Sequence, residues 1–203
     1  MSSHHFVKEQ QEPALLILDT SATYESISPL LEWSPTVLVA EMAVDTVLSW
    51  GIKVDVILAT FDYQKTNLHL LEEQYPVKFM AVQECRYLEE GLHYLVASKH
   101  SAVNIIGYDH LKVLELEQFL DLIDLVVIDG TMRYFPVKQR GFRKWYAGVS
   151  LHLLAPEGTL VEITSDERIQ HIYITRDTFV RAHGQVSFLA ENMFWIGEMM
   201  TDN

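Results

Sequence analysis

Short runs of apolar residues, many of them β-branched, recur through the first two-thirds of the chain. Runs of this length without polar alternation are typical of strands that are buried on both faces. We therefore expect these strands to form the interior of a layered domain. The predicted strands are Ala14–Asp19, Thr36–Glu41, Val54–Thr60, Val77–Val82, Ala102–Tyr108 and Asp124–Asp129.

Two segments between these strands carry apolar residues at helical spacing. The first runs from Arg86 to Lys99 and the second from His110 to Leu122. Strands that alternate with helices predict a mostly parallel sheet covered by helices on both faces. The apolar stripes are Leu88, Leu92 and Leu95 in the first segment, and Leu111, Leu114 and Phe119 in the second.

The pattern changes near Thr131 to short segments with partial two-residue alternation, which predicts antiparallel strands. We expect an α/β fold with a Rossmann-like, nucleotide-binding type of domain over 1–130 and a small antiparallel β-sandwich or barrel over 131–203. The predicted strands of the second domain are Met132–Val137, Val149–Leu154, Thr159–Ile163, Ile169–Thr175, Gln185–Leu189 and Met193–Gly197. The predicted polar separators are Lys138–Lys144, Pro156–Gly158, Ser165–Arg168 and Arg181–Gly184.

Composition adds limits on partners and location. The 203 residues are 49% hydrophobic, which is ample for a core, and 28 acidic residues against 15 basic ones give a net charge of −13. This charge has the wrong sign for a nucleic-acid or anionic-membrane partner. Cys85, the single cysteine, cannot form an internal disulfide, and no apolar run approaches the ~18 residues of a membrane span. With no apolar leader at the N-terminus, the sequence predicts a cytoplasmic protein.

Polar side chains follow several predicted strands at their carboxyl ends, where open parallel sheets bind ligands. Thr60 and Asp62 project to the same side if the chain stays extended, and converging carboxylates commonly hold Mg²⁺ together with substrate phosphates. Taken singly, such residues more often cap helices, so only their joint placement favours a site. The strand-end residues are Asp19, Thr20, Glu41, Thr60, Asp62, Gln83, Glu84, Asp109 and His110.

One segment, Val39 to Asp62, is more specific than these single residues. It resembles the thiamine pyrophosphokinase family, which has Ala-Asp-Gly-Gly-Ala-Asn, a short helix, Gly-Ile-x-Pro-Asp, an apolar strand and Gly-Asp-x-Asp-Ser at the same spacing. The best-preserved piece is Gly51-Ile-Lys-Val-Asp55.

The resemblance extends over nearly the whole chain. Gly107 with Asp109-His110 is similar to the family's Gly-x-x-Asp-His, and Gln83-Glu84 stands where the family has a polar pair. In the second domain, Val149-Ser-Leu151 looks like the family's Val-Ser-Leu strand. Near the end of the chain, Ser187 and Asn192-Met-Phe194 are similar to its Ser and Asn-Glu-Phe.

The resemblance implies transfer of a pyrophosphoryl group from ATP to thiamine with Mg²⁺, in a homodimer. It implies that Glu41, Asp62 and Glu84 bind the metal and that Asp62, Glu41 and Asp109 are catalytic. The ligand-binding residues that it implies are Gln83, Glu84, His110, Asn192 and Trp195. For Trp195 the alternative is an ordinary core aromatic.

Several positions depart from the family pattern and leave alternatives open. The Gly-Gly pair is Met42-Ala43, one metal-facing Asp is Thr60, and the family's Thr-Asp aligns with Arg86-Tyr87. Phosphoryl transfer relies on positioning and electrostatic stabilisation, so lost carboxylates remove a main source of rate. The first alternative is a non-catalytic thiamine- or nucleotide-binding homologue. The second is another reaction on a phosphorylated substrate, with Asp109-His110 as the acid/base pair.

Overall fold

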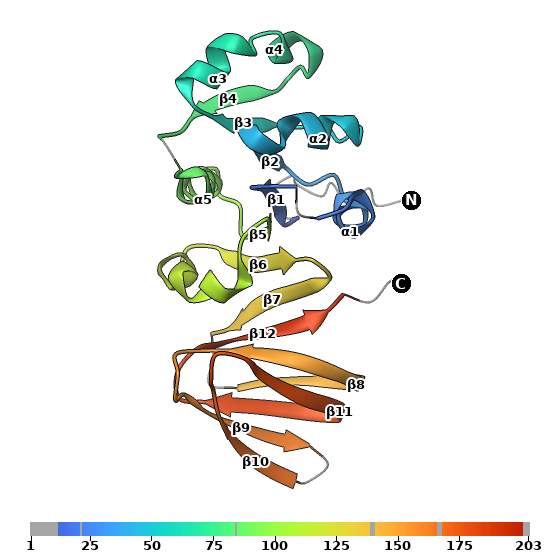
Figure 1. Ribbon diagram of the computed structural model, residues 1–203, viewed down its shortest axis with the longest axis vertical. Helices are drawn as coiled ribbons and strands as arrows, with labels where there is room; N and C mark the ends of the chain where they lie inside the picture. The colour runs from blue at the N-terminus through green and yellow to red at the C-terminus, as the bar shows by residue number, and fades with distance from the viewer. Residues whose placement is uncertain (1–11, 21, 84, 139–140, 166–167, 201–203) are drawn as a thin grey trace, which may run out of the picture. The chain divides into compact units, whose positions relative to one another are not determined.

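The computed structural model describes residues 12–20, 22–83, 85–138, 141–165 and 168–200. The chain divides into two compact units. Figure 1 shows the chain coloured from blue at the N-terminus to red at the C-terminus. The first unit comprises Met1–Tyr108 and Asp121–Leu125, and the second comprises Asp109–Leu120 and Val126–Asn203. By the family resemblance, 1–130 is a nucleotide-binding type of domain and 131–203 an all-β thiamine-binding type of domain, and this assignment stays a prediction.

The sheet of the first unit is parallel and has the strand order β5-β1-β2-β3-β4. Residues of β1 pair on one side with β2 and on the other with β5, as in Leu16 with Leu38 and with Ile105. Every residue of β1, β2 and β3 is buried, which explains their unbroken apolar sequences. The prediction of a parallel sheet is confirmed. The strands are β1 Ala14–Ile17, β2 Val37–Ala40, β3 Val56–Ala59, β4 Lys78–Ala81 and β5 Ala102–Ile106.

Helices cover this sheet, with α5 on one side of the strands and α1 and α2 on the other (Figure 1). Gly91 of α5 packs so closely on the sheet that a Cβ there would contact the side chains of Leu16 and Leu58. The predicted helix over 86–99 is confirmed by α5. The helices are α1 Tyr24–Ile27, η1 Ser28–Leu31, η2 Glu41–Ala43, α2 Val44–Ser49, α3 Phe61–Thr66, α4 Leu70–Glu73 and α5 Tyr87–Ala97, where η marks a 3₁₀ helix.

The second predicted helix is a 3₁₀ helix, η3, over His110–Phe119. Its buried residues, Val113, Leu116 and Phe119, are three apart, as expected when three residues make one turn. In the predicted stripe, Phe119 is buried as expected, but Leu111 is exposed and Leu114 is only half-buried, so the stripe is wrong for these two residues. The error came from applying the 3.6-residue period of an α-helix to this segment.

The strands of the second unit pair antiparallel, in the order β10-β9-β11-β8-β12-β7-β6. The fold is thus mixed α/β, with parallel strands in the N-terminal part and antiparallel strands in the C-terminal part. The predicted sandwich or barrel is not confirmed by these pairings. The strands are β6 Asp124–Asp129, β7 Met132–Val137, β8 Gly141–Leu154, β9 Leu160–Ser165, β10 Arg168–Tyr173, β11 Thr178–Ala190 and β12 Phe194–Met199.

Two predicted separators belong to long strands instead. Residues 141–144 lie in β8, and residues 181–184 lie inside β11. The two strands pair along nearly their whole length, with a register shift at Ala182/His183. Polar residues on the outer face of such a pair resemble a loop in sequence, because only one face of the strand is buried.

The core of the second unit gathers side chains from one face of this antiparallel sheet, including Phe188, Phe194 and Ile196. Trp195 lies between the last two in β12, so its side chain points to the opposite face, where it is also fully buried. Among the described residues, no helix is both long and apolar enough to cross a membrane.

Candidate functional site

Glu41 stands at the carboxyl end of β2 and holds together the polar residues at this edge of the first unit. Its Oε2 accepts hydrogen bonds from the backbone N–H of Thr60 at 2.7 Å and from the Thr60 hydroxyl at 3.0 Å. Its Oε1 accepts from the Tyr87 hydroxyl at 2.9 Å. A carboxylate oxygen has two lone pairs, so Oε2 is saturated and Oε1 retains one acceptor position.

Asp62 does not join this network. The chain turns into α3 at Phe61, with Thr60 as the N-cap whose hydroxyl accepts from the Tyr63 N–H. The extended geometry that would point Thr60 and Asp62 to one side is therefore absent. The Asp62 side chain is 96% exposed and pairs with Lys65 at 3.5 Å. An exposed pair of this kind contributes little energy, so Asp62 is free to turn toward a ligand in solvent.

Tyr63 directly follows Asp62, where the resemblance to Gly-Asp-x-Asp-Ser places the family's serine. The pKa of its phenol is raised by burial, and further by the charges of Asp45 and Glu41. The phenol therefore stays protonated at neutral pH and offers a hydrogen-bond donor near two carboxylates. Met42, at one of the family's glycine positions, is exposed at 59% and does not fill the protein interior.

Gly107 brings the end of β5 against the segment that follows β1. Its φ is +81°, and an added Cβ would lie 2.5 Å from the backbone nitrogen of Asp19 and closer still to the Asp19 carboxylate. Only glycine fits this approach. Gly107 is therefore required by the packing of the first unit.

The second unit contains a cluster of Asp109, His110 and Asp129. The His110 Nδ1 lies 2.7 Å from the Asp129 Oδ2, which also accepts the His110 backbone N–H at 3.3 Å. Asp109 caps η3 by accepting the Leu111 N–H at 2.9 Å, and its Oδ1 is 3.9 Å from the His110 Nδ1. A carboxylate on Nδ1 fixes the proton there and leaves Nε2 with its lone pair, the form of histidine that accepts protons.

Two buried rings hold the His110 imidazole. Tyr134 stacks on it with ring centroids 4.8 Å apart and planes 16° apart, and His152 stands edge-on at 5.6 Å. Burial lowers the pKa of His152, and the charge of His110 lowers it further, while Asp177 opposes this. Burial next to Asp129 raises the pKa of Tyr134 to about 12. Both neighbours are therefore neutral at pH 7.

The remaining residues implied by the resemblance lie in different surroundings. Gln83 and Asn192 are exposed in loops, and Glu84 lies outside the described residues. Trp195 is fully buried, and its indole N–H has no hydrogen-bond partner within the described chain. This full burial agrees with the alternative that Trp195 is an ordinary core aromatic. The structure thus groups Glu41 with Thr60 and Tyr87, and Asp109 and His110 with Asp129.

At the strand ends of the first unit, Glu41 and Asp62 do not form a metal site from protein ligands alone. Glu41 has one acceptor position left, and Asp62 points into solvent. Within the described ranges, the one trio whose ligand atoms lie within 4.8 Å of one another is Asp109, His110 and Asp129. A magnesium ion that arrives with nucleotide phosphates needs only one or two protein carboxylates, which this chain can supply.

Sequence reasoning missed three contributors to these clusters: Asp129, Tyr87 and His152. Asp129 had a usable signal, because it is the last residue of a correctly predicted strand, where ligand-binding residues are expected. Tyr87 had a weaker one, because the resemblance aligns it with an aspartate of the family. His152 had none, since a histidine in a strand looks like an ordinary packing residue in sequence.

Comparison with known proteins identifies the fold. No family model and no curated protein matches the chain. Thiamin pyrophosphokinase from Geobacillus thermodenitrificans has 11% sequence identity and a TM-score of 0.69, covering 94% of this chain and 99% of that chain. The enzyme from Bacillus subtilis gives 10% identity, a TM-score of 0.68 and coverage of 93% and 100%. The enzyme from Candida albicans has 11% sequence identity and a TM-score of 0.62, covering 97% of this chain and 91% of that chain. The chain therefore has the fold of these structures over nearly its whole length.

Proposed function

We propose that the chain is a divergent thiamine pyrophosphokinase, which transfers a pyrophosphoryl group from magnesium-bound ATP to the hydroxyl of thiamine and releases AMP. The observation that carries this proposal is the likeness of fold along almost the entire chain, in both units, to structures named as thiamin pyrophosphokinases. The polar residues at strand ends in the first unit add to it, because they lie where a parallel sheet receives its ligand.

In this proposal the chain's own residues bind the substrates and accept one proton. The thiamine oxygen attacks the β-phosphorus of ATP, the bond from that phosphorus to the α-phosphate oxygen breaks, and AMP leaves with that oxygen. His110 Nε2 takes the hydroxyl proton, with Asp129 holding its tautomer and Asp109 beside it.

The proposed substrate contacts are those that the family resemblance implies. Glu41, Asp62 and Glu84 contact the magnesium of the nucleotide. Gln83 and Asn192 bind the substrates.

A second candidate is a non-catalytic binder of thiamine or nucleotide. It is favoured by the three hydrogen bonds that engage Glu41 inside the protein and by Thr60, Arg86 and Tyr87 at family carboxylate or Thr-Asp positions. Such a protein retains the ligand cavity of the fold without the charges that accelerate transfer.

The two candidates are separated by measuring AMP release from ATP with thiamine and magnesium. Turnover in the wild-type protein that disappears in a Glu41→Ala, Asp62→Ala double variant supports the enzyme. Wild-type turnover no greater than that of the double variant rejects it. A saturable thermal shift with thiamine, thiamine diphosphate or ATP but no turnover identifies the binder. We also propose a cytoplasmic homodimer, and sedimentation of the purified protein as a monomer would contradict the dimer.

A further inference from the structure

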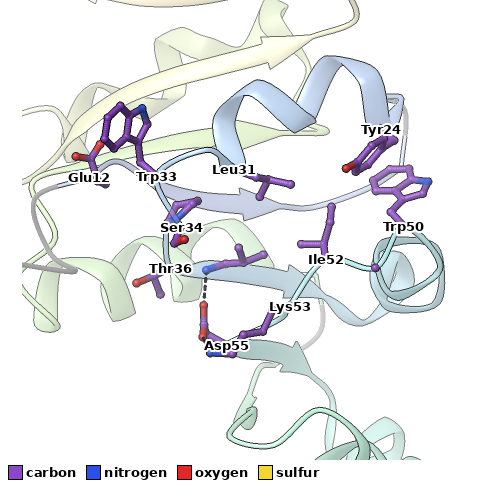
Figure 2. Close-up of a pocket in the computed structure, with 13 residues that line it drawn as sticks. Glu12, Tyr24, Leu31, Trp33, Ser34, Thr36, Trp50, Ile52, Lys53 and Asp55 are labelled. Atoms are coloured by element: carbon purple, nitrogen blue, oxygen red, sulfur yellow. Dashed lines mark hydrogen bonds and ion pairs between the residues drawn. The ribbon is translucent and has the colours of Figure 1, made fainter. Parts of the chain in front are cut away.

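A pocket of about 520 Å³ opens in the first unit at the amino-terminal ends of β2 and β3 (Figure 2). Val37, the first residue of β2, and Asp55, just before β3, both line it. Glu41 and Thr60 follow the opposite, carboxyl ends of the same two strands. The pocket is therefore separate from the Glu41 network, and its volume suits a small organic molecule.

Three aromatic side chains, Tyr24, Trp33 and Trp50, line this pocket. Tyr24 and Trp50 meet at one end of it with ring centroids 6.4 Å apart and planes inclined at 52°, and Trp33 lies at the other end (Figure 2). Trp33 is 69% exposed and Tyr24 is 43% exposed. The faces of these rings are therefore open to a ligand from solvent.

The charge that faces the pocket is negative. Asp55 accepts the Val37 N–H at 2.9 Å and pairs with Lys53 at 3.4 Å, so these two side chains neutralise one another. Glu12 also lines the pocket, and no hydrogen bond or ion pair joins it to another described residue. One carboxylate thus remains to attract a cation, and no unpaired basic side chain lines the pocket to attract an anion.

We propose that this pocket binds an alkylated ammonium cation, with the charged group in the corner of Tyr24 and Trp50. Glu12 lies beside Trp33 at the other end of the pocket (Figure 2), where its charge adds a longer-range attraction. Aromatic faces attract such cations within about 6 Å of the ring centroid. Two rings inclined at 52° form a corner rather than a parallel slot, which suits a rounded methylated ammonium better than a flat ring. The proposal does not depend on the proposed function, because it concerns the other edge of the sheet.

The test uses choline as the probe with the full-length protein. Trp50 lies in the proposed corner, so binding is followed by tryptophan fluorescence and by saturation-transfer NMR on the choline methyl groups. We expect saturable binding, and no binding of 3,3-dimethyl-1-butanol, which has the same shape as choline without the charge. Tyr24→Leu keeps the bulk but removes the π face, and we expect about tenfold weaker binding. Glu12→Gln should weaken binding less than Tyr24→Leu does and should reduce its salt dependence.

Tyr173→Leu is the matched control, because Tyr173 is 66% exposed but lies in β10 of the second unit. It should bind choline as the wild-type protein does. Equal binding of choline and its neutral isostere, unchanged binding by Tyr24→Leu, or no saturable response up to about 50 mM choline would overturn the proposal. If Tyr24→Leu loses its native circular dichroism, the comparison of choline with its neutral isostere on the wild-type protein decides the question, and equal binding of the two rejects the site.

Discussion

A carboxylate at the end of a strand can face a ligand or can bind its own protein, and Glu41 does the second. Its three hydrogen bonds join β2 to the residue that follows β3 and to the start of α5. Hydrogen bonds to a charged acceptor are about twice as strong as neutral ones. The residue that best matches the family's first aspartate therefore has a structural role that can be measured directly.

We predict that Glu41→Ala lowers the free energy of unfolding by about 2 kcal/mol, because it leaves the Thr60 N–H without its acceptor. Glu41→Gln should lose less than half of this, since its amide oxygen can still accept from Thr60. Urea denaturation measures both. Asp62→Ala is the control, and its exposed side chain should change stability by less than about 0.5 kcal/mol. A Glu41→Ala protein as stable as the control would mean that Glu41 is held for a ligand instead.

His152 gives a prediction about pH. Its pKa is lowered by burial and by His110, so the unfolded chain takes up a proton that the folded protein resists. The contribution of His152 to the free energy of unfolding is therefore fully present above about pH 6.5, and it decreases as the pH falls below that value. We expect His152→Phe, which can still stack on Phe179, to lose less stability than wild type between about pH 7.5 and about pH 5.5.

The control for this measurement is His171→Gln, since the His171 side chain in β10 is 57% exposed. Urea denaturation of the three proteins at each pH gives the comparison. A His152→Phe protein with the same pH dependence as wild type would show that other groups cause the loss.

At the scale of elements, the sequence predicted the fold where hydrophobic burial alone decides structure. The strand Asp124–Asp129 and the strand Met132–Val137 were predicted with the observed bounds, and α5 within two residues at each end. The prediction failed where buried residues recur with a period other than 3.6, and where only one face of a strand is buried. η3 buries every third residue, and β8 and β11 expose polar faces that look like loops.

The candidate site was less predictable for a physical reason. Sequence position located Glu41 and His110 at strand ends, but it could not choose their partners. Glu41 contacts Tyr87, 46 residues away, and His110 contacts Asp129 rather than the adjacent Asp109. Partners of this kind are set by how strands and helices pack, which a single sequence does not display.

The link between β5 and β1 provides a prediction at this scale. Gly107→Ala should lower the free energy of unfolding by more than about 2 kcal/mol, because the new Cβ meets the backbone of Asp19 and φ is +81°. Gly158→Ala is the control. Its φ is +83°, but no atom lies within 4 Å of the added Cβ, so about 1 kcal/mol of conformational strain is the expected loss. Equal losses in the two variants by urea denaturation would contradict the close approach at Gly107.

At the scale of the whole molecule, the two units are not two consecutive stretches of the sequence. The 3₁₀ segment 109–120 belongs to the second unit, the short stretch 121–125 returns to the first, and residues from 126 onward belong to the second again. A fragment that begins near residue 130 therefore lacks the parts of the second unit that lie before residue 130 in the sequence. These parts include His110 and Asp129, whose hydrogen bonds lie wholly within that unit.

This arrangement predicts different behaviour for two fragments. In a fragment 109–203, β6 can still pair with β7 through Val127 with Tyr134 and Ile128 with Arg133, and His110 can still cover the Tyr134 ring. A fragment 131–203 loses these contacts and leaves one edge of β7 without its partner, an arrangement that favours aggregation. We expect the longer fragment to unfold cooperatively and to be more stable by at least about 2 kcal/mol, because each hydrogen bond contributes about 1 kcal/mol. Thermal unfolding by circular dichroism measures this difference, and a fragment 131–203 that is equally stable and cooperative would place the boundary of the folding unit at residue 130.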